Sequence, residues 1–265
     1  MIEKARHSGR RIRQTITSFG NGPQILGAMV GRRVLGRPEE LTFALQGGGT
    51  VTCPNRPGAR VPVYEVFAED AYRLSWFTDD LGPDVAALDI GGHIGCFSLA
   101  FARLHPEARV HAYEASPTTA SFLARNISDN ALGDRVHSHA QAVSSERGTL
   151  EFADNVHGSA LNGLTAPEGA ATVKVEAITF ADAVAAAGGQ VDVVKIDTEG
   201  AEYDIVLGSK PADWDGVRRV VLEYHDVPGH GWAELEAFFA EAGLDTVRHE
   251  PATPAQGTAW LRRSA

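Results

Sequence analysis

Residues 85–102 read VAALDIGGHIGCFSLAFA, and this stretch decides the fold class of the 265-residue chain. It begins with the apolar run VAALDI, turns at Gly91 and Gly92, and continues as IGCFSLAFA, whose apolar spacing favours a helix. A buried strand that leads into a helix through a glycine-rich turn is the first unit of a parallel α/β sheet. We therefore expect Asp89 at the carboxyl end of a strand and Gly95 at the start of a helix.

Strand-like and helix-like segments alternate through the rest of the chain, which indicates parallel strands joined by helices. In order they are ARVHAYEA, PTTASFLARNISDNA, VHSHAQAVS, ITFADAVAAAG, VDVVKID, AEYDIVLGS, VRRVVLEYH and GWAELEAFFAEAG. Residues 244–250 and 257–263 suit an antiparallel pair at the end of the chain. The segments GTLEFAD (148–154) and ATVKVE (171–176) predict an additional small strand pair.

The first 84 residues differ from the rest in charge and pattern. Residues 1–37 hold eight Lys and Arg against one acid, Glu3, although the whole chain has a net charge of -10. We interpret them as a basic arm, which is either a solvated helical segment or a docking element for an acidic partner such as a carrier protein. Residues 38–84 alternate around three glycines and continue as an aromatic, helix-compatible stretch. We expect a hairpin and helical cap over the substrate, and a main domain at residues 85–265.

Composition excludes several classes of protein. The net charge of -10 and the pI near 5.4 argue against general nucleic-acid binding, because nucleic-acid-binding domains are usually basic. No apolar run approaches the roughly 20 residues that a membrane helix needs, and the N-terminal stretch lacks the apolar core of an export signal. Cys53 and Cys96 lie far apart and have no zinc-ligand spacing, so neither a disulfide framework nor a zinc site is predicted. These features predict a cytoplasmic protein without a nucleic-acid or membrane partner.

The segment Asp89–Gly95, DIGGHIG, has the composition of a cofactor turn. Glycines let the backbone approach a ligand and adopt positive φ. The following helix presents free N–H groups to a carboxylate, such as that of S-adenosylmethionine (SAM). Glu114 ends the next expected strand, where its carboxylate can accept hydrogen bonds from both hydroxyls of a ribose.

NAD-binding proteins share that acidic residue, so the glycine spacing has to distinguish the two cofactors. The dinucleotide pattern Gly-x-Gly-x-x-Gly fails from Gly91, because His93 and Cys96 occupy its second and third glycine positions. The SAM pattern Asp-x-Gly-x-Gly-x-Gly is met at Asp89, Gly91 and Gly95, with His93 in place of the middle glycine. The spacing favours SAM over NAD, and a glycine turn that serves only strand-to-helix packing is the alternative.

Several segments together resemble the FkbM family of SAM-dependent methyltransferases. Along the chain they are LDIGGHIGCFSLAFA, VHAYEASP, ARNISDNAL, QAVSSERGTLEF, VDVVKIDTEGAEYDIVLGS and VVLEYH. The most specific of them contains Lys195–Glu202, KIDTEGAE, which is similar to the family's Lys-Ile-Asp-x-Glu-Gly-x-Glu signature. The resemblance covers residues 65–225 well and the N-terminal arm hardly at all.

This resemblance implies a Rossmann-like class I methyltransferase fold, with a seven-stranded, mostly parallel α/β sheet and an antiparallel C-terminal strand. It implies SAM as the methyl donor, S-adenosylhomocysteine as the product, and most often O-methylation of a hydroxyl on a natural product or sugar. The family usually has Ala-Asn where this chain has Gly92-His93. That Asn contacts the methionine end of the cofactor, a role in which the ring nitrogens of His93 could substitute.

Residues 85–265 are therefore expected to be a SAM-binding methyltransferase domain. The residues that we assign to the cofactor are Asp89, Gly91, Gly92, His93, Gly95, Glu114, Ala115, Ala142 and Asp197.

Methyl transfer is an in-line displacement at a sulfonium methyl, so the protein has to align the acceptor and remove or share its proton. Asp197, Glu199 and Glu202 place three carboxylates after one strand, and Glu223 and His225 end the neighbouring strand. Asp197 is expected to contact the SAM ammonium or the acceptor, and Glu199 is expected near the acceptor. His225 is the candidate general base, because histidine titrates near neutral pH.

Each of these residues has an alternative role. Asp197 could cap the following helix. Glu199 and Glu202 could stand at the start of that helix only because the helix dipole favours acidic residues in the first turn. His225 could be a hydrogen-bonded structural residue. The same groups could ligate Mg²⁺, an alternative that we do not favour, and no metal ligand is assigned. Lys195 lies in an apolar strand, where burial would require a carboxylate partner.

Two other functions are weighed against methyl transfer. An NAD-dependent oxidoreductase is disfavoured by the glycine spacing and by the lack of a Tyr-x-x-x-Lys motif. A catalytically silent SAM-binding scaffold is disfavoured only by the intact acidic motif. The acceptor is expected to be a small molecule such as a glycoside or a polyketide, and a homo-oligomer is left open.

Overall fold

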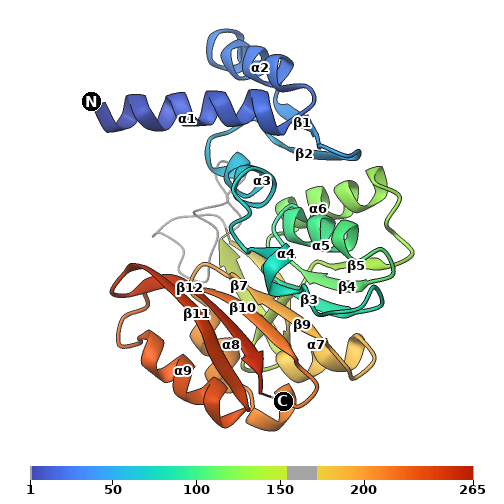
Figure 1. The fold of residues 1–265 in the computed structure, drawn as a ribbon, viewed down its shortest axis with the longest axis vertical. Coiled ribbons are helices and arrows are strands. Elements are labelled where there is room, and N and C mark those ends of the chain that lie inside the picture. Colours follow the sequence, from blue (N-terminus) through green and yellow to red (C-terminus); the bar gives the residue numbers. More distant parts are fainter. Residues whose placement is uncertain (1, 154–171, 265) are drawn as a thin grey trace.

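A seven-stranded sheet forms the centre of the molecule (Figure 1). The structure is a computed structural model and describes residues 2–153 and 172–264. The strand order is β11-β12-β10-β9-β3-β4-β5. The strands are β3 (Ala86–Ile90), β4 (Arg109–Tyr113), β5 (Val136–His139), β9 (Val193–Ile196), β10 (Arg219–Tyr224), β11 (Leu244–Thr253) and β12 (Gln256–Arg263). β12 runs antiparallel to both of its neighbours, whereas β10, β9, β3, β4 and β5 pair in parallel. The predicted seven-stranded sheet with an antiparallel C-terminal strand is confirmed.

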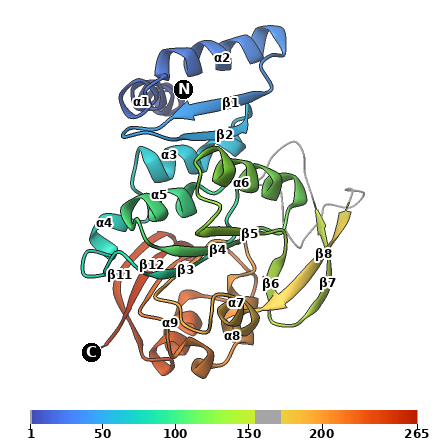
Figure 2. The same ribbon diagram turned by 90° about the vertical axis from the view of Figure 1, so that its right-hand side faces the viewer.

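Helices cover both faces of this sheet (Figure 2). One face carries α5 (Cys96–Leu104) and α6 (Pro117–Asp129), and the other carries α7 (Phe180–Ala186), α8 (Glu202–Gly208) and α9 (Trp232–Glu241). All five residues of β3 are buried, and successive side chains enter opposite cores. Ala87 packs in the core that contains α5, and Leu88 packs in the core that contains α9. A parallel sheet that is covered on both faces requires such an uninterrupted apolar run.

The segment VHSHAQAVS, which we expected to form one strand, is divided between two sheets. β5 ends at His139, and β6 (Ala142–Ser144) joins a small sheet of order β6-β8-β7. In that sheet β7 (Gly148–Ala153) and β8 (Thr172–Thr179) form the predicted strand pair, and they run antiparallel. Asp154 and Ala171, at the ends of the two predicted segments, lie outside the described residues.

The helix expected from residue 178 begins at Phe180, because Thr179 belongs to β8 and caps α7. The hydroxyl of Thr179 accepts a hydrogen bond from the N–H of Asp182, and the Asp182 carboxylate accepts one from the N–H of Thr179. This reciprocal pair is a capping box, which satisfies donors that the first helical turn leaves unpaired.

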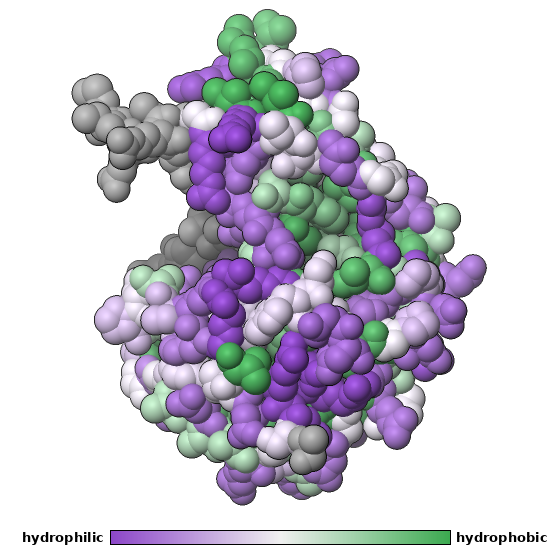
Figure 3. Space-filling view, in the orientation of Figure 1, coloured by the Kyte–Doolittle hydropathy of each residue, from purple (hydrophilic) through white to green (hydrophobic). Residues whose placement is uncertain are grey.

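The first two helices and the hairpin lie together at one end of the molecule (Figure 1). α1 (Ile2–Ser18) and α2 (Gly22–Leu35) pack with the antiparallel strands β1 (Glu40–Ala44) and β2 (Thr50–Pro54). The rings of Phe19 and Phe43 meet edge to face with centroids 4.8 Å apart, and Ile25 is buried in the same cluster. Val30 and Val34 on α2 stay exposed, and Figure 3 shows an apolar patch over this end. The predicted division of the chain at residue 37 stays a prediction.

Three short helical elements connect this N-terminal layer to the sheet. η1 (Gly58–Arg60) leads into α3 (Val61–Phe67), and α4 (Leu74–Phe77) follows. The side-chain amide of Asn126, on α6, bridges the N–H and C=O of Thr52 on β2, and it also donates to the carbonyl of Ile94. These bonds fix the hairpin against α6 and against the turn after β3. Within the described part of the chain, no helix is long and apolar enough to cross a membrane.

Candidate active site

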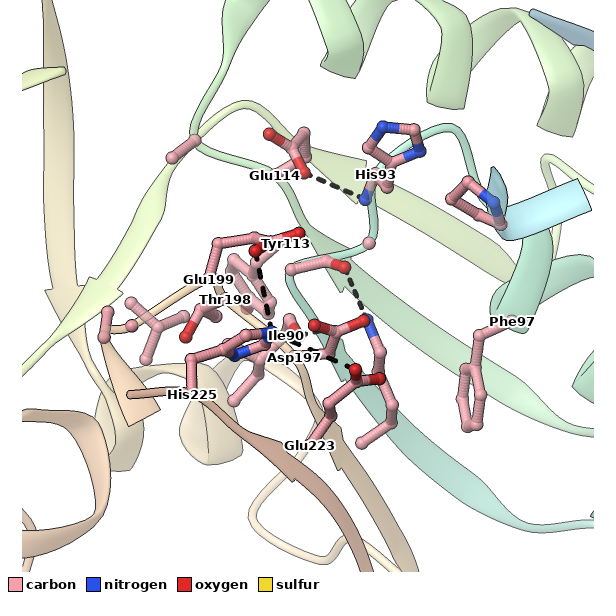
Figure 4. A pocket seen from close by; sticks show the side chains of 18 of the residues that line it. Ile90, His93, Phe97, Tyr113, Glu114, Asp197, Thr198, Glu199, Glu223 and His225 are labelled. Carbon is pink, nitrogen blue, oxygen red and sulfur yellow. Dashed lines mark hydrogen bonds and ion pairs between the residues drawn. The ribbon is translucent and has the colours of Figure 1, made fainter. Parts of the chain in front are cut away.

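A cavity of about 460 Å³ opens at the carboxyl ends of β3, β4, β9 and β10, beside α3 (Figure 4). The strand order reverses between β3 and β9, which is where parallel sheets bind ligands. Nine of the residues assigned from the sequence line this cavity: Gly91, Gly92, His93, Glu114, Ala115, Ala142, Asp197, Glu199 and His225. The tertiary structure therefore brings five separate parts of the sequence to one site.

Gly91 makes the turn after β3 possible. Its φ is 74°, and a Cβ on this residue would lie 1.8 Å from the carbonyl oxygen of Asp197. The N–H groups of Gly91 and Gly92 both donate to the carbonyl of Tyr113, at 3.0 and 2.8 Å. The turn is thus held closely between β4 and β9, and residue 91 has to be glycine.

We expected Asp89 and Gly95 at the cofactor, but the structure places both behind the turn. Asp89 is completely buried, and its carboxylate accepts a hydrogen bond from Ser98 at 2.6 Å and pairs with Lys195 at 3.1 Å. Gly95 has a φ of 91°, and a Cβ there would lie 2.8 Å from Cδ1 of Leu123. Neither residue lines the cavity. The contacts of both residues face the protein interior and shape the turn.

Lys195 connects the turn to Asp197. Its Nζ is buried, pairs with Asp89, donates to the carbonyl of Gly91 at 2.5 Å and lies 3.9 Å from Oδ2 of Asp197. Burial lowers the pKa of Lys195, but the neighbouring carboxylates, Asp89 first, outweigh burial and raise it. The lysine remains a cation, and Asp89 is the partner that its apolar strand requires.

His93 presents a buried nitrogen that a ligand can satisfy. Its φ is 48°, a left-handed value that histidine and asparagine adopt more readily than most residues. Burial, with the charge of Lys195, lowers the pKa of His93 to about 4, so the ring is neutral at neutral pH. Nδ1 is buried and has no hydrogen-bond partner among the described residues. An unpaired buried nitrogen that lines a cavity fits the polar methionine end of SAM.

Glu114 fits the ribose of the same cofactor. Its carboxylate is buried, and each oxygen accepts one backbone hydrogen bond: Oε2 from His93 at 2.9 Å and Oε1 from Ser116 at 2.8 Å. Each oxygen keeps a further lone pair for a hydroxyl of the ligand. Burial raises the pKa of Glu114 to about 7, so its charge depends on pH near neutrality.

Acidic side chains line the side of the cavity away from His93 and Glu114 (Figure 4). They are Glu65 from α3, Asp197 and Glu199 after β9, and Glu223 at the end of β10. Burial, reinforced by the charge of Asp197, raises the pKa of Glu65 to about 7 and the pKa of Glu223 to about 8. Carboxylates that repel one another in a shared cavity favour a ligand with positive charge.

His225 lies among these carboxylates and is hydrogen-bonded to Glu202. Its Nδ1 is 3.1 Å from Oε1 of Glu202, and its Nε2 is 3.5 Å from Oε2 of Glu199. Burial lowers the pKa of His225, but the hydrogen bond and charge of Glu202, with the charges of Asp197 and Glu199, outweigh burial and raise it to about 9. His225 therefore carries a proton at neutral pH. A protonated imidazole cannot accept a proton, so the general-base role expected from the sequence requires a lower pKa of His225 than this.

Glu202 supports the site from behind. Besides His225, it accepts hydrogen bonds from the N–H groups of Thr198 and Gly200. Burial raises the pKa of Glu202, but these donors, His225 first, outweigh burial and lower it. The last acid of the KIDTEGAE segment thus organises the loop after β9 and fixes the imidazole.

A metal ion could be held by Asp197, Glu223 and His225. One ligand atom from each lies within 4.8 Å of the others, and no other such group occurs in residues 2–153 and 172–264. Two carboxylate oxygens and one imidazole nitrogen are ligands of divalent cations.

The sequence did not point to Glu65 or Tyr72 as site residues. The hydroxyl of Tyr72 donates to Oδ2 of Asp197 at 2.9 Å, across 125 positions of sequence. Both residues belong to the cap, where the only signal was a helix-compatible, aromatic and acidic composition that also suits core packing.

Comparison with known proteins identifies the family. A model of the FkbM methyltransferase domain matches residues 89–245. The 31-O-demethyl-FK506 methyltransferase FkbM of Streptomyces tacrolimicus is 30% identical over 241 residues, which cover 79% of this chain and 90% of that protein. The methyltransferase sdnD of Sordaria araneosa is 28% identical over 215 residues, which cover 69% and 81%. The structure of TYW2 from Pyrococcus horikoshii in complex with MeSAdo shares the fold, with a TM-score of 0.50, 15% identity, and coverage of 89% of this chain and 81% of that one. The chain belongs to the FkbM family of methyltransferases.

Proposed function

We propose that this protein is a SAM-dependent O-methyltransferase that acts on a hydroxyl of a small natural product or sugar. The observation that carries the proposal is one cavity with two chemically different ends. His93 and Glu114 provide a donor or acceptor nitrogen and a carboxylate at one end, and Asp197, Glu223 and His225 provide proton-handling groups at the other. The name of the Streptomyces tacrolimicus relative specifies an oxygen of FK506, which supports a hydroxyl acceptor.

SAM supplies a methyl group on a positively charged sulfur. The chain's own residues bind and orient it: Glu114 accepts the ribose hydroxyls, His93 pairs with the methionine end, and Gly91 and Gly92 let the backbone approach. The start of α5 adds free N–H groups for a carboxylate. Ala115 and Ala142 line the same end of the cavity with small side chains.

Asp197, Glu199 and His225 are proposed to face the acceptor. Two of the carboxylates that raise the pKa of His225, Asp197 and Glu199, line the cavity, and a sulfonium there would offset their charge and lower the pKa of His225 in the complex. The imidazole then becomes a base for the acceptor hydroxyl near neutral pH. Alignment of acceptor and methyl group is expected to provide the larger part of the rate, about 7–11 kcal/mol in favourable cases.

Calorimetric titration with SAM, S-adenosylhomocysteine and NAD tests the proposal, followed by methyl transfer to 31-O-demethyl-FK506, glycosides and polyketides. We expect both sulfur compounds to bind and NAD not to bind. Binding of NAD without SAM would overturn the proposal, and SAM binding without transfer to any acceptor would favour a silent scaffold. Loss of activity after exhaustive chelation would favour Mg²⁺ at Asp197, Glu223 and His225, whereas we expect activity to persist.

A further inference from the structure

Tyr72 is the point at which the N-terminal cap touches Asp197. It lies between α3 and α4, its side chain is buried, and it lines the cavity. Its hydroxyl donates to Oδ2 of Asp197 at 2.9 Å. Burial, with the charge of Asp197, raises the pKa of Tyr72 well above its ordinary value, so the hydroxyl stays a donor at physiological pH.

The backbone around Tyr72 adopts an uncommon conformation. Asp70 and Arg73 both have a φ of 50°, a left-handed value that costs free energy in residues other than glycine. The Asp70 carboxylate accepts a hydrogen bond from the N–H of Leu74 at 3.1 Å, and Arg73 pairs with Glu250 at 2.9 Å. Strained backbone persists only where the surroundings impose it, and here these contacts do so.

The ring of Tyr72 is also held in place. Trp260 on β12 donates its indole N–H to the carbonyl of Tyr72 at 2.8 Å. Phe97 on α5 packs edge to face against the ring, with centroids 5.5 Å apart. The hydroxyl of Tyr72 therefore reaches Asp197 from a fixed support made of the sheet and α5.

Tyr72 and Lys195 both approach the same oxygen of the Asp197 carboxylate. Lys195 lies 3.9 Å from the same oxygen, Oδ2, and already pairs with Asp89 at 3.1 Å. Without the Tyr72 hydroxyl, the carboxylate would be drawn further toward Lys195. With the hydroxyl in place, Oδ1 has no hydrogen-bond partner in residues 2–153 and 172–264 and is available to the cavity.

We propose that Tyr72 is a positioning residue that fixes the Asp197 carboxylate toward the positively charged sulfur of the methyl donor. The inference rests on the proposed use of SAM and assigns recognition of the donor's charge to a residue of the cap. SAM and S-adenosylhomocysteine share the adenosine, ammonium and carboxylate groups and differ in the methyl group and the charge on sulfur. A residue that acts through Asp197 therefore affects SAM and spares S-adenosylhomocysteine.

Calorimetric titration of the full chain with both compounds tests this inference. We expect Tyr72→Phe to raise the Kd for SAM about fivefold to tenfold and the Kd for S-adenosylhomocysteine less than about twofold, because a charge-assisted hydrogen bond is lost. Asp197→Asn should weaken SAM binding further, and Tyr72→Phe should then have no additional effect, since coupled residues are not additive. The matched control is Tyr64→Phe, which removes another buried cap hydroxyl, bonded to Thr15 at 2.7 Å.

The outcomes separate the explanations. Equal weakening of both compounds, an undiminished effect of Tyr72→Phe in the Asp197→Asn protein, or no effect at all would overturn the positioning role. A wild-type protein that binds neither compound would overturn the proposed function itself. Thermal unfolding of each variant shows whether it is folded. If Tyr72→Phe does not fold, Asp197→Asn keeps the inference testable.

Discussion

The imidazole of His225 and the carboxylate of Glu202 are joined by a hydrogen bond of 3.1 Å, and Glu202 is completely buried. A fully buried carboxylate beside an imidazole favours the protonated ring. Glu202 does not line the cavity, so it influences the site through its bonds to His225 and to the N–H groups of Thr198 and Gly200.

Glu202→Gln should release His225 from this control. We expect the pKa of His225 to fall from about 9 toward its ordinary value of 6.5, by about one to two pH units. NMR titration of the histidine ring measures the change. The control is Glu234→Gln, which removes the exposed partner of His230 and should leave His225 unchanged. An unaltered titration of His225 in Glu202→Gln would show that Glu199 and Asp197 suffice.

The same shift predicts how stability depends on pH. The folded-state pKa of His225 is raised, so its contribution to stability is fully present below pH 6.5 and is lost as the pH rises through 9. We expect the free energy of unfolding in urea to decline between pH 6.5 and 9, and to decline less in His225→Gln. Equal declines in the two proteins would assign the dependence to other groups, Glu223 first.

Lys195→Met should destabilise the protein strongly, because it leaves Asp89 buried without its cation. Removing one partner of a buried ion pair costs about 3–5 kcal/mol in the free energy of unfolding. Chemical denaturation measures the loss. Lys174→Met removes an exposed lysine on β8 and should change stability by less than about 0.5 kcal/mol. Similar values for the two variants would contradict the role assigned to the pair.

Binding of S-adenosylhomocysteine should strengthen with pH, because Glu114 has to be ionised to accept two ribose hydroxyls. With a pKa of about 7 in the free protein, raising the pH from 6 to 8 is expected to lower the Kd about tenfold. S-adenosylhomocysteine carries no sulfonium, so the acidic side of the cavity contributes less than it does with SAM. Calorimetry at both pH values tests this, and a dependence that survives in Glu114→Gln would exclude Glu114 as its source.

Gly91→Ala should abolish SAM binding. It should also lower the free energy of unfolding by more than the cost of placing alanine at a positive φ. Its φ is 74°, and the new Cβ would lie 1.8 Å from the carbonyl oxygen of Asp197. Gly188→Ala is the matched control, because its φ is 93° and no atom lies within 4 Å of the Cβ that it would add. It should lower the free energy of unfolding only by the cost of a left-handed backbone, about 1–2 kcal/mol. Equal losses of unfolding free energy would mean that the contact with Asp197 is relieved by a small shift.

The order of elements and the place of the site follow from the sequence, because both depend on local patterns. Uninterrupted apolar runs indicate strands covered on two faces, and helical spacing between them indicates crossovers, so the carboxyl ends of the strands have to meet at one edge. That reasoning brings Glu114, Asp197 and His225 to one cavity, where the structure places them. Local pattern could not show that VHSHAQAVS divides between two sheets, because both halves have strand composition.

The sequence by itself determined the fold class, the glycine turn between β3 and α5, and the family, since apolar periodicity, glycine spacing and a continuous acidic motif can all be read along one stretch of chain. Only the tertiary structure decided the state of the site. In the folded chain Asp89 points inward and pairs with Lys195, and Tyr72 donates a hydrogen bond to Asp197, 125 positions away in sequence. His225 is hydrogen-bonded to the buried carboxylate of Glu202. Burial and the approach of distant charges set these contacts and pKa values, and neither quantity exists until the chain has folded.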